Sequence, residues 1–146
     1  MCEYPMESAG TEAAWFLDAR IAEYNRSLAP FTQTEPFVPF VRVIRDECGN
    51  ILAGIQGVLY FWQIMSVDVL WVREDCRGRG LGSRLLQTAE EYTREQGGSL
   101  VHLDTFDFQA REFYEKHGYT AFGVLEDCPT GHCRFYMEKK LWQEKE

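Results

Sequence analysis

The sequence predicts one α/β domain spanning residues 1–146. It is a mixed, mostly antiparallel sheet of about six to seven strands, flanked by helices, with a central strand–helix–strand unit. Short apolar, β-branched stretches alternate with amphipathic helical ones, and a glycine-rich turn joins one strand directly to a helix. The 146 residues are 45% hydrophobic and 14% aromatic, which suffices for one buried core and argues against disorder.

The first forty residues predict one helix and one loop. Met1 to Gly10 forms either a short edge strand or a loose segment. Thr11 to Ser27 has apolar residues at helical spacing, and Pro30 prevents the helix from continuing. Phe31 to Pro39 is expected to be a loop, which either lines a substrate pocket or is an ordinary packed connection.

A meander of antiparallel strands follows. Phe40 to Arg45 and Ile51 to Phe61 have the composition of strands, and the segment Asp46 to Asn50 between them contains Gly49, as a hairpin turn requires. Ile64 to Val72 is the next expected strand. It pairs antiparallel with the strand before it because only a short turn separates the two.

A glycine-rich turn organises the rest of the chain. After the charged turn Arg73 to Cys76, three glycines alternate at the start of a helix that ends at Gly97-Gly98; they are Gly78, Gly80 and Gly82. Glycines leave no side chains over the first helical turn, so its unpaired N–H groups are open to an anion, and Arg77 and Arg79 add positive charge.

This pattern predicts a phosphate cradle. The spacing is G-x-G-x-G with no Gly-Lys-Ser/Thr, so it fits neither a P-loop nor the dinucleotide fingerprint G-x-G-x-x-G. The alternative is a tight strand-to-helix turn that binds no ligand.

The C-terminal part predicts a buried strand, a helix and two closing strands. Ser99 to Phe106 should lie parallel to Val67 to Val72, because a helix crosses between them. Asp107 to His117 has helical periodicity and stops at Gly118. The closing strands are Tyr119 to Leu125 and Arg134 to Leu141, around the loop Glu126 to Cys133.

The charge of the chain limits its partners. A net charge of -8 and a pI near 4.9 disfavour binding to nucleic acid or to an anionic membrane and fit a cationic small substrate better. The window Arg73 to Arg84 differs, because it holds four arginines and only two acidic residues. A polyanionic ligand is expected there. No segment reaches the roughly 20 apolar residues that span a bilayer.

Five scattered cysteines predict a reducing, cytoplasmic location rather than a disulfide framework. Cys128, His132 and Cys133 are close in sequence, but their spacing does not match a zinc knuckle and no second ligand pair is present. We therefore expect no metal.

Two motifs resemble the GNAT family of acetyl-CoA-dependent N-acetyltransferases. The first is a strand ending in Leu-Trp-Val followed by Arg77-x-x-Gly80-x-Gly82. The second, about 25 residues further on, is Ala110-x-x-Phe113-Tyr114-Glu115-Lys116-x-Gly118-Tyr119. The resemblance covers roughly Met65 to Leu141. It implies a GNAT-like sandwich and the transfer of an acetyl group from acetyl-CoA to an amine.

The resemblance also implies roles for matched positions. The turn would bind the pyrophosphate of coenzyme A through its backbone N–H groups, at Arg77, Gly78, Arg79, Gly80, Leu81, Gly82 and Ser83. The backbone of Leu70, Trp71 and Val72 would pair with the pantetheine arm. Tyr114 matches a tyrosine that acts as general acid near the thioester sulfur. Asp107 occupies the place of a cofactor-contacting asparagine, and its alternative role is a helix N-cap.

The chemistry also calls for a base. An amine with a pKa near 10.4 must lose a proton, which costs about 4–5 kcal/mol at pH 7. Asp68 is the candidate, because strict strand alternation puts it on one face with Leu70 and Val72. Alternatively, Asp68 is a structural carboxylate that is paired or exposed at the sheet edge. His102, Asp104 and His117 are expected to be structural, Cys76 is too far from the thioester to be a nucleophile, and His132 could reach the acceptor site.

The favoured function is N-acetylation of a small, cationic amine by direct attack in a ternary complex with acetyl-CoA. One alternative is a non-catalytic acyl-CoA-binding or regulatory module. Another is acetylation of a protein N-terminus or lysine. A homodimer through the C-terminal strands is implied by the resemblance alone.

Overall fold

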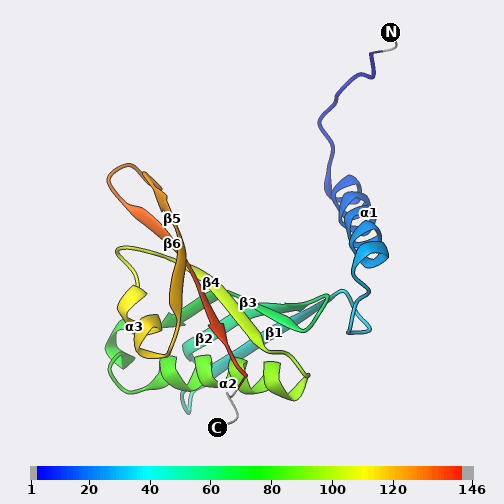
Figure 1. Ribbon diagram of the computed structural model, residues 1–146. Helices are drawn as coiled ribbons and strands as arrows, with labels where there is room; N and C mark the ends of the chain where they lie inside the picture. The colour runs from blue at the N-terminus through cyan, green and yellow to red at the C-terminus, as the bar shows by residue number, and fades with distance from the viewer. Residues whose placement is uncertain (1–2, 143–146) are drawn as a thin grey trace.

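The computed structural model describes residues 3–142 and contains three helices, six strands and one short 3₁₀ turn (Figure 1). In chain order these are α1 (Thr11–Leu28), β1 (Phe37–Arg45), β2 (Ile51–Tyr60), β3 (Ile64–Val72), η1 (Glu74–Cys76), α2 (Leu81–Glu95), β4 (Leu100–Phe106), α3 (Arg111–Lys116), β5 (Thr120–Glu126) and β6 (Cys133–Lys140).

The strands form one mixed sheet in the order β1-β2-β3-β4-β6-β5. Only β3 and β4 pair in parallel, because α2 carries the chain across between them, and the other neighbours are antiparallel. The predicted α/β class, the mixed and mostly antiparallel sheet and its central strand–helix–strand unit are confirmed.

The two parallel strands part halfway along their length. They pair over Ile64–Val67 and Leu100–Leu103, after which β3 continues beside β2 and β4 continues beside β6. The β4-facing backbone of residues 68–72 therefore has no strand partner within residues 3–142. This opening in the sheet lies next to the start of α2.

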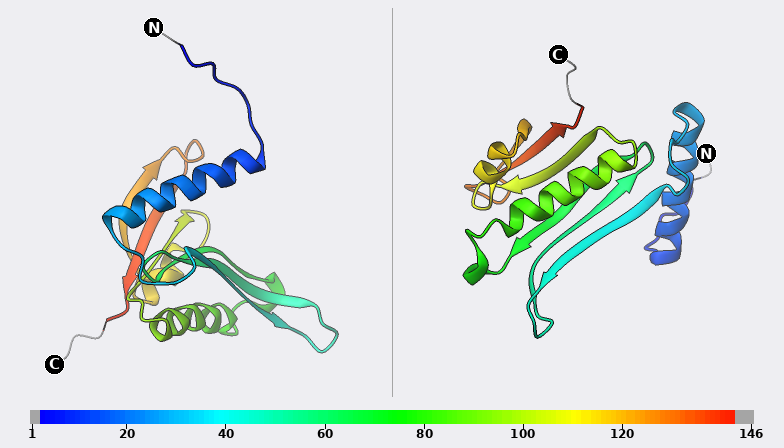
Figure 2. Two further views of the ribbon diagram at one scale, coloured as in Figure 1. Left: turned by 90° about the vertical axis from the view of Figure 1, so that its right-hand side faces the viewer. Right: turned by 90° about the horizontal axis from the view of Figure 1, so that it is seen from below.

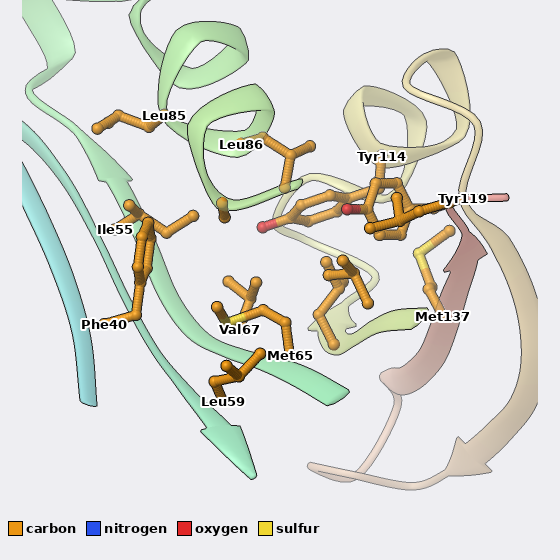
Figure 3. Packing of buried hydrophobic residues seen from close by; sticks show 14 of the residues in the cluster. Phe40, Ile55, Leu59, Met65, Val67, Leu85, Leu86, Tyr114, Tyr119 and Met137 are labelled. Atoms are coloured by element: carbon orange, nitrogen blue, oxygen red, sulfur yellow. The ribbon is translucent and has the colours of Figure 1, made fainter. Parts of the chain in front are cut away.

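Helices α2 and α3 cover one face of the sheet (Figure 2, right). Leu85, Leu86 and Ala89 on the inner side of α2 are buried against strand residues. Figure 3 shows this core from close by, with Tyr114 of α3 and Tyr119 beside Leu86 and Met137. The packing fixes the first turn of α2 relative to the sheet opening.

A buried carboxylate ties α2 to the last strands. Glu90 is only 3% exposed. It accepts hydrogen bonds from the Tyr119 hydroxyl at 3.0 Å and from the Lys139 ammonium at 2.8 Å. Burial raises the pKa of Tyr119, and the contact with the Glu90 carboxylate adds to the shift. The helical pattern of the sequence does not single out Glu90.

We expect Glu90→Ala to lower the free energy of unfolding by about 2 kcal/mol, because it leaves a buried hydroxyl and a mostly buried ammonium without their acceptor. Urea unfolding followed by circular dichroism measures the change. Glu91→Ala, at the exposed neighbouring position, is the matched control and should stay within about 0.5 kcal/mol. Equal stability of the two variants would contradict this account of the contact.

Helix α1 forms where the sequence predicts it but does not pack on the sheet. It stands beyond the ends of the strands, on the side away from α2 (Figures 1 and 2). Ala22 is its only buried residue. The segment before it, residues 3–10, has no strand, and Met1 and Cys2 lie outside the described residues.

Two predicted elements begin several residues away from where the sequence places them. Strand β1 begins at Phe37, inside the expected loop, and it accommodates Pro39 because an edge strand pairs on one side only. Helix α3 begins at Arg111, after a turn, so Asp107 precedes the helix and its interpretation as an N-cap is wrong. None of the three helices in residues 3–142 is long and apolar enough to cross a membrane.

Candidate functional site

A cleft of about 680 Å³ lies where β3 and β4 part. It is bounded by the end of β3, the glycine turn, the start of α2 and the segment that leads into α3. All the predicted cofactor residues except Arg79 and Asp107 line it, and so does Tyr114. Phe108, Gln109, Ala110 and Phe113 also line it, and no motif in the sequence points to a role for Phe108 or Gln109.

The glycines of the turn serve two purposes. Gly78 and Gly80 adopt φ values of 77° and 78°, the left-handed region that glycine enters at no steric cost. A Cβ on either would meet no atom within 4 Å, so both face open space. Gly82 differs, because its Cβ would lie 3.3 Å from the Phe113 ring. It permits α2 and α3 to pack closely.

The first turn of α2 has the features of an anion site. Gly80 caps the helix, and Arg84 is the first residue whose N–H bonds back to it, at 3.0 Å. The N–H groups of Leu81, Gly82 and Ser83 therefore have no acceptor within the helix. No acidic side chain occupies this turn. Open space, free donors and the helix dipole together fit a phosphate group.

Two side chains shape the walls of this cradle. Arg77 donates from Nε to the Val72 carbonyl at 3.1 Å, which fixes its guanidinium at the end of β3. His117 lies 2.7 Å from the Phe113 carbonyl through Nδ1 and 2.8 Å from the Ser83 hydroxyl through Nε2. A neutral imidazole that donates from Nδ1 accepts the Ser83 proton at Nε2. His117 is thus a structural link, and Ser83 offers the cleft its backbone N–H.

Tyr114 lines the cleft with a buried side chain and a protonated hydroxyl. Burial raises its pKa to about 12, and the nearby Asp104 carboxylate adds to the shift. Among the described residues its hydroxyl has no hydrogen-bond partner, and the atom is not cut off from solvent. It is available as a hydrogen-bond donor to a ligand in the cleft.

Asp68 does not lie where strict alternation predicts. The β2–β3 register shifts so that Gln56 pairs with Val69 and Gly57 pairs with Val67, which leaves Asp68 as an extra residue in a β-bulge. Val67 consequently packs into the same core as Leu70 and Val72. Asp68 is exposed, does not line the cleft and lies 3.4 Å from the Ser66 hydroxyl.

Polar groups gather around Asp68 near the opening. His102 pairs with Ser66 one position before the last paired residues of β3 and β4, and its Nε2 lies 2.6 Å from the Tyr60 hydroxyl. Burial lowers the pKa of His102 despite the nearby carboxylates of Asp104, Asp68 and Glu138. His102 is therefore neutral at pH 7, next to a group of negative charges.

Asp107 is held away from the cleft. Its carboxylate accepts the backbone N–H of Cys133 at 2.8 Å and contacts His132 Nδ1 at 2.8 Å, and both contacts lower its pKa. These contacts fix the base of the β5–β6 loop and engage His132. Within residues 3–142, no three His, Cys, Asp or Glu side chains are grouped in a way that could hold a metal ion.

Known proteins resemble this chain in sequence and in fold. The model of the acetyltransferase (GNAT) family matches residues 6–119. Blasticidin-S acetyltransferase of Streptomyces morookaense is 35% identical over 113 residues, which are 77% of this chain and 82% of the relative. The crystal structure of an acetyltransferase from Bacillus cereus has a TM-score of 0.84 and 37% identity, over 94% of this chain and 98% of the other.

A more distant structure shares the fold alone. An aminoglycoside 6'-N-acetyltransferase complexed with coenzyme A has a TM-score of 0.65 at 17% identity, over 90% of this chain and 94% of the other. The family model, in contrast, spans most of the chain, including the glycine turn and Tyr114. The chain therefore belongs to the GNAT family of acetyltransferases, enzymes that take their acetyl group from acetyl-CoA.

Proposed function

We propose that this protein transfers the acetyl group of acetyl-CoA to an amine of a small, cationic molecule. The observation that carries the proposal is the cleft at the parting of β3 and β4, which combines an anion cradle, a free strand edge and the Tyr114 hydroxyl. We infer that the cradle binds the pyrophosphate and that the backbone of residues 70–72 hydrogen-bonds the pantetheine arm.

Acetyl transfer to an amine breaks a carbon–sulfur bond and forms a carbon–nitrogen bond. The site must therefore take a proton from the amine and stabilise a thiolate. Tyr114 serves the second task by donating a hydrogen bond. Moving its proton fully to a thiolate with an ordinary pKa of about 8.5 would cost about 5 kcal/mol, given its raised pKa of about 12. Its hydrogen bond strengthens as negative charge develops on sulfur.

The acceptor is proposed to approach from the sheet face that carries Asp68 and His102. Asp68, Asp104 and Glu138 all lie near His102, and Arg134 pairs with Asp104 at 2.7 Å. This surplus of carboxylates favours a cation. The 35% identity to a blasticidin-S acetyltransferase supports a small-molecule acceptor of antibiotic type. The free cysteines at positions 48, 76, 128 and 133 support a reducing, cytoplasmic setting.

Thiol release measured over a panel of acceptors tests this proposal. The panel contains blasticidin S, aminoglycosides, polyamines, and peptides with a free N-terminus or a lysine. Acetylation of a small amine supports the proposal. Preferential acetylation of the peptides would favour a protein acetyltransferase, and acetyl-CoA binding without thiol release from any acceptor would favour a non-catalytic binding module.

For Asp68 as the base, we expect Asp68→Asn to lower kcat/KM for the amine about 10-fold, because water and His102 provide weaker routes for the proton. The Kd for acetyl-CoA should not change, since Asp68 does not line the cleft. Glu91→Gln, at an exposed position of α2 that does not line the cleft, makes the same change of net charge and is the control. Equal kcat/KM in both variants would eliminate Asp68 as the base.

A further inference from the structure

Helix α1 presents an apolar stripe that no other part of residues 3–142 covers. Leu17, Ile21, Tyr24 and Leu28 recur at helical spacing and lie on one side of the helix. Their side chains are 54–70% exposed. We call these four residues the α1 stripe. An 18-residue helix with such a stripe is expected to pack against another surface.

The sheet has an uncovered apolar surface on the face opposite α2. Strand register places Val41 and Val69 on either side of Gln56, and Val43 and Trp71 on either side of Gly54. These four apolar side chains are 40–55% exposed, and we call them the β1–β3 face. The Val43 side chain leans over Gly54, where a Cβ would lie 3.3 Å from its Cγ1. An antiparallel pair of strands can leave one face in water, but the residues on that face are then mostly polar, so four apolar side chains here indicate a surface that packs against a partner.

The two surfaces are kept apart within one chain by a fixed connector. Trp62 Nε1 donates to the Ala29 carbonyl at 3.1 Å, and the Thr32 N–H donates to the Phe61 carbonyl at 3.1 Å. The Phe31 ring stacks on Phe61 with centroids 4.6 Å apart. These contacts hold α1 beyond the end of the sheet (Figures 1 and 2). Folding α1 back onto its own sheet would break them.

We propose that the protein forms a two-fold dimer in which α1 of each copy lies on the β1–β3 face of the other. This exchange covers the α1 stripe and the β1–β3 face of each copy, and it keeps the connector of each copy intact. With on the order of 100 Å² exposed per side chain, the four stripe residues and the four face residues together bury about 800 Å² for each docked helix. Two docked helices therefore bury roughly 1,600 Å², which is the size of a standard stable interface.

The exchange also places the partner's helix close to the candidate functional site. Trp71 belongs to the β1–β3 face and lines the cleft, so a helix docked on this face lies at the edge of the cleft. The partner's α1 then forms one wall of the acceptor site, an inference that rests on the proposed function. The dimer itself does not rest on it.

Sedimentation velocity of the full chain at 1–100 µM tests the dimer. The wild type is expected to be dimeric, and Ile21→Asp in the α1 stripe and Val43→Asp on the β1–β3 face should each be monomeric. An equal mixture of the two variants should recover dimer, because a mixed pair retains one unaltered helix on one unaltered face. Phe16→Ser, on another side of α1, is the matched control and should remain dimeric.

Three results would overturn the proposal. The first is a monomeric wild type at 100 µM. The second is a dimer that Ile21→Asp dissociates but neither Val43→Asp nor Val41→Asp affects, since the helices would then pack on each other. The third is a dimer that survives Ile21→Asp but not Phe122→Asp, which would place the interface on the C-terminal strands. Circular dichroism verifies folding, and the sedimentation result stands whether or not acetyl-CoA binds.

Discussion

Gly80→Asp is expected to weaken acetyl-CoA binding at least about 100-fold while the protein stays folded. Gly80 caps α2 in the left-handed region with open space where its Cβ would be, and Asp tolerates that conformation. A carboxylate there would face the phosphate groups. Two unit charges about 4 Å apart repel by about 4 kcal/mol at the effective dielectric of a protein surface. Calorimetric titration with acetyl-CoA measures the loss.

Gly80→Asn is the control that separates the effect of the negative charge on acetyl-CoA binding from the effect of the added side-chain volume. Its side chain has almost the same shape as Asp and also tolerates the left-handed region, but it carries no charge. We expect its Kd for acetyl-CoA to rise by less than about 5-fold. Thermal unfolding without ligand should show Gly80→Asp at least as stable as Gly80→Asn, because a negative charge at a helix N-terminus is favourable. Equal weakening of binding by both variants would mean that the turn does not bind the phosphates.

Tyr114→Phe is expected to lower kcat about 100-fold and to change the Kd for acetyl-CoA by less than about 3-fold. The substitution removes only the hydroxyl, which has no partner among residues 3–142 and whose hydrogen bond matters most as charge builds on the leaving sulfur. Tyr119→Phe is the matched control. The ring centroid of Tyr119 is 5.8 Å from that of Tyr114, but the Tyr119 hydroxyl donates a hydrogen bond to Glu90 and not into the cleft. The Tyr119→Phe variant should therefore be less stable than the wild type and keep its kcat.

The raised pKa of Tyr114 also predicts the shape of the pH–rate profile. Since burial raises this pKa to about 12, the hydroxyl stays protonated through neutral and moderately alkaline pH. The pH–rate profiles of the wild type and of Tyr114→Phe should therefore have the same shape near pH 10, because Tyr114 does not ionise there. A decline there that is present only in the wild type would mean that Tyr114 ionises at its ordinary pKa.

The glycine turn and the element order could be predicted from the sequence because they depend on local patterns. Glycine spacing specifies a turn with positive φ at Gly78 and Gly80, and hydrophobic periodicity specifies α2. The crossover helix then requires β3 and β4 to be parallel. These features can be predicted without knowing which distant segments of the chain pair with each other.

The features that the sequence does not predict depend on pairing between distant segments. The bulge that reorients Asp68 is a property of the β2–β3 register, which strict alternation along one strand cannot show. Asp107 is engaged by His132 and Cys133, 25 and 26 residues later in the chain. The apolar residues of α1 predict a helix correctly but do not say which surface it covers.

The most direct test of the central claim is calorimetric titration of the wild-type protein with acetyl-CoA, and with ATP and NAD as controls. The cleft between β3 and β4 predicts micromolar, one-to-one binding of acetyl-CoA and much weaker binding of the two nucleotides, which lack a pantetheine arm for the free edge of β3. No binding of acetyl-CoA, or equal binding of all three, would contradict the account.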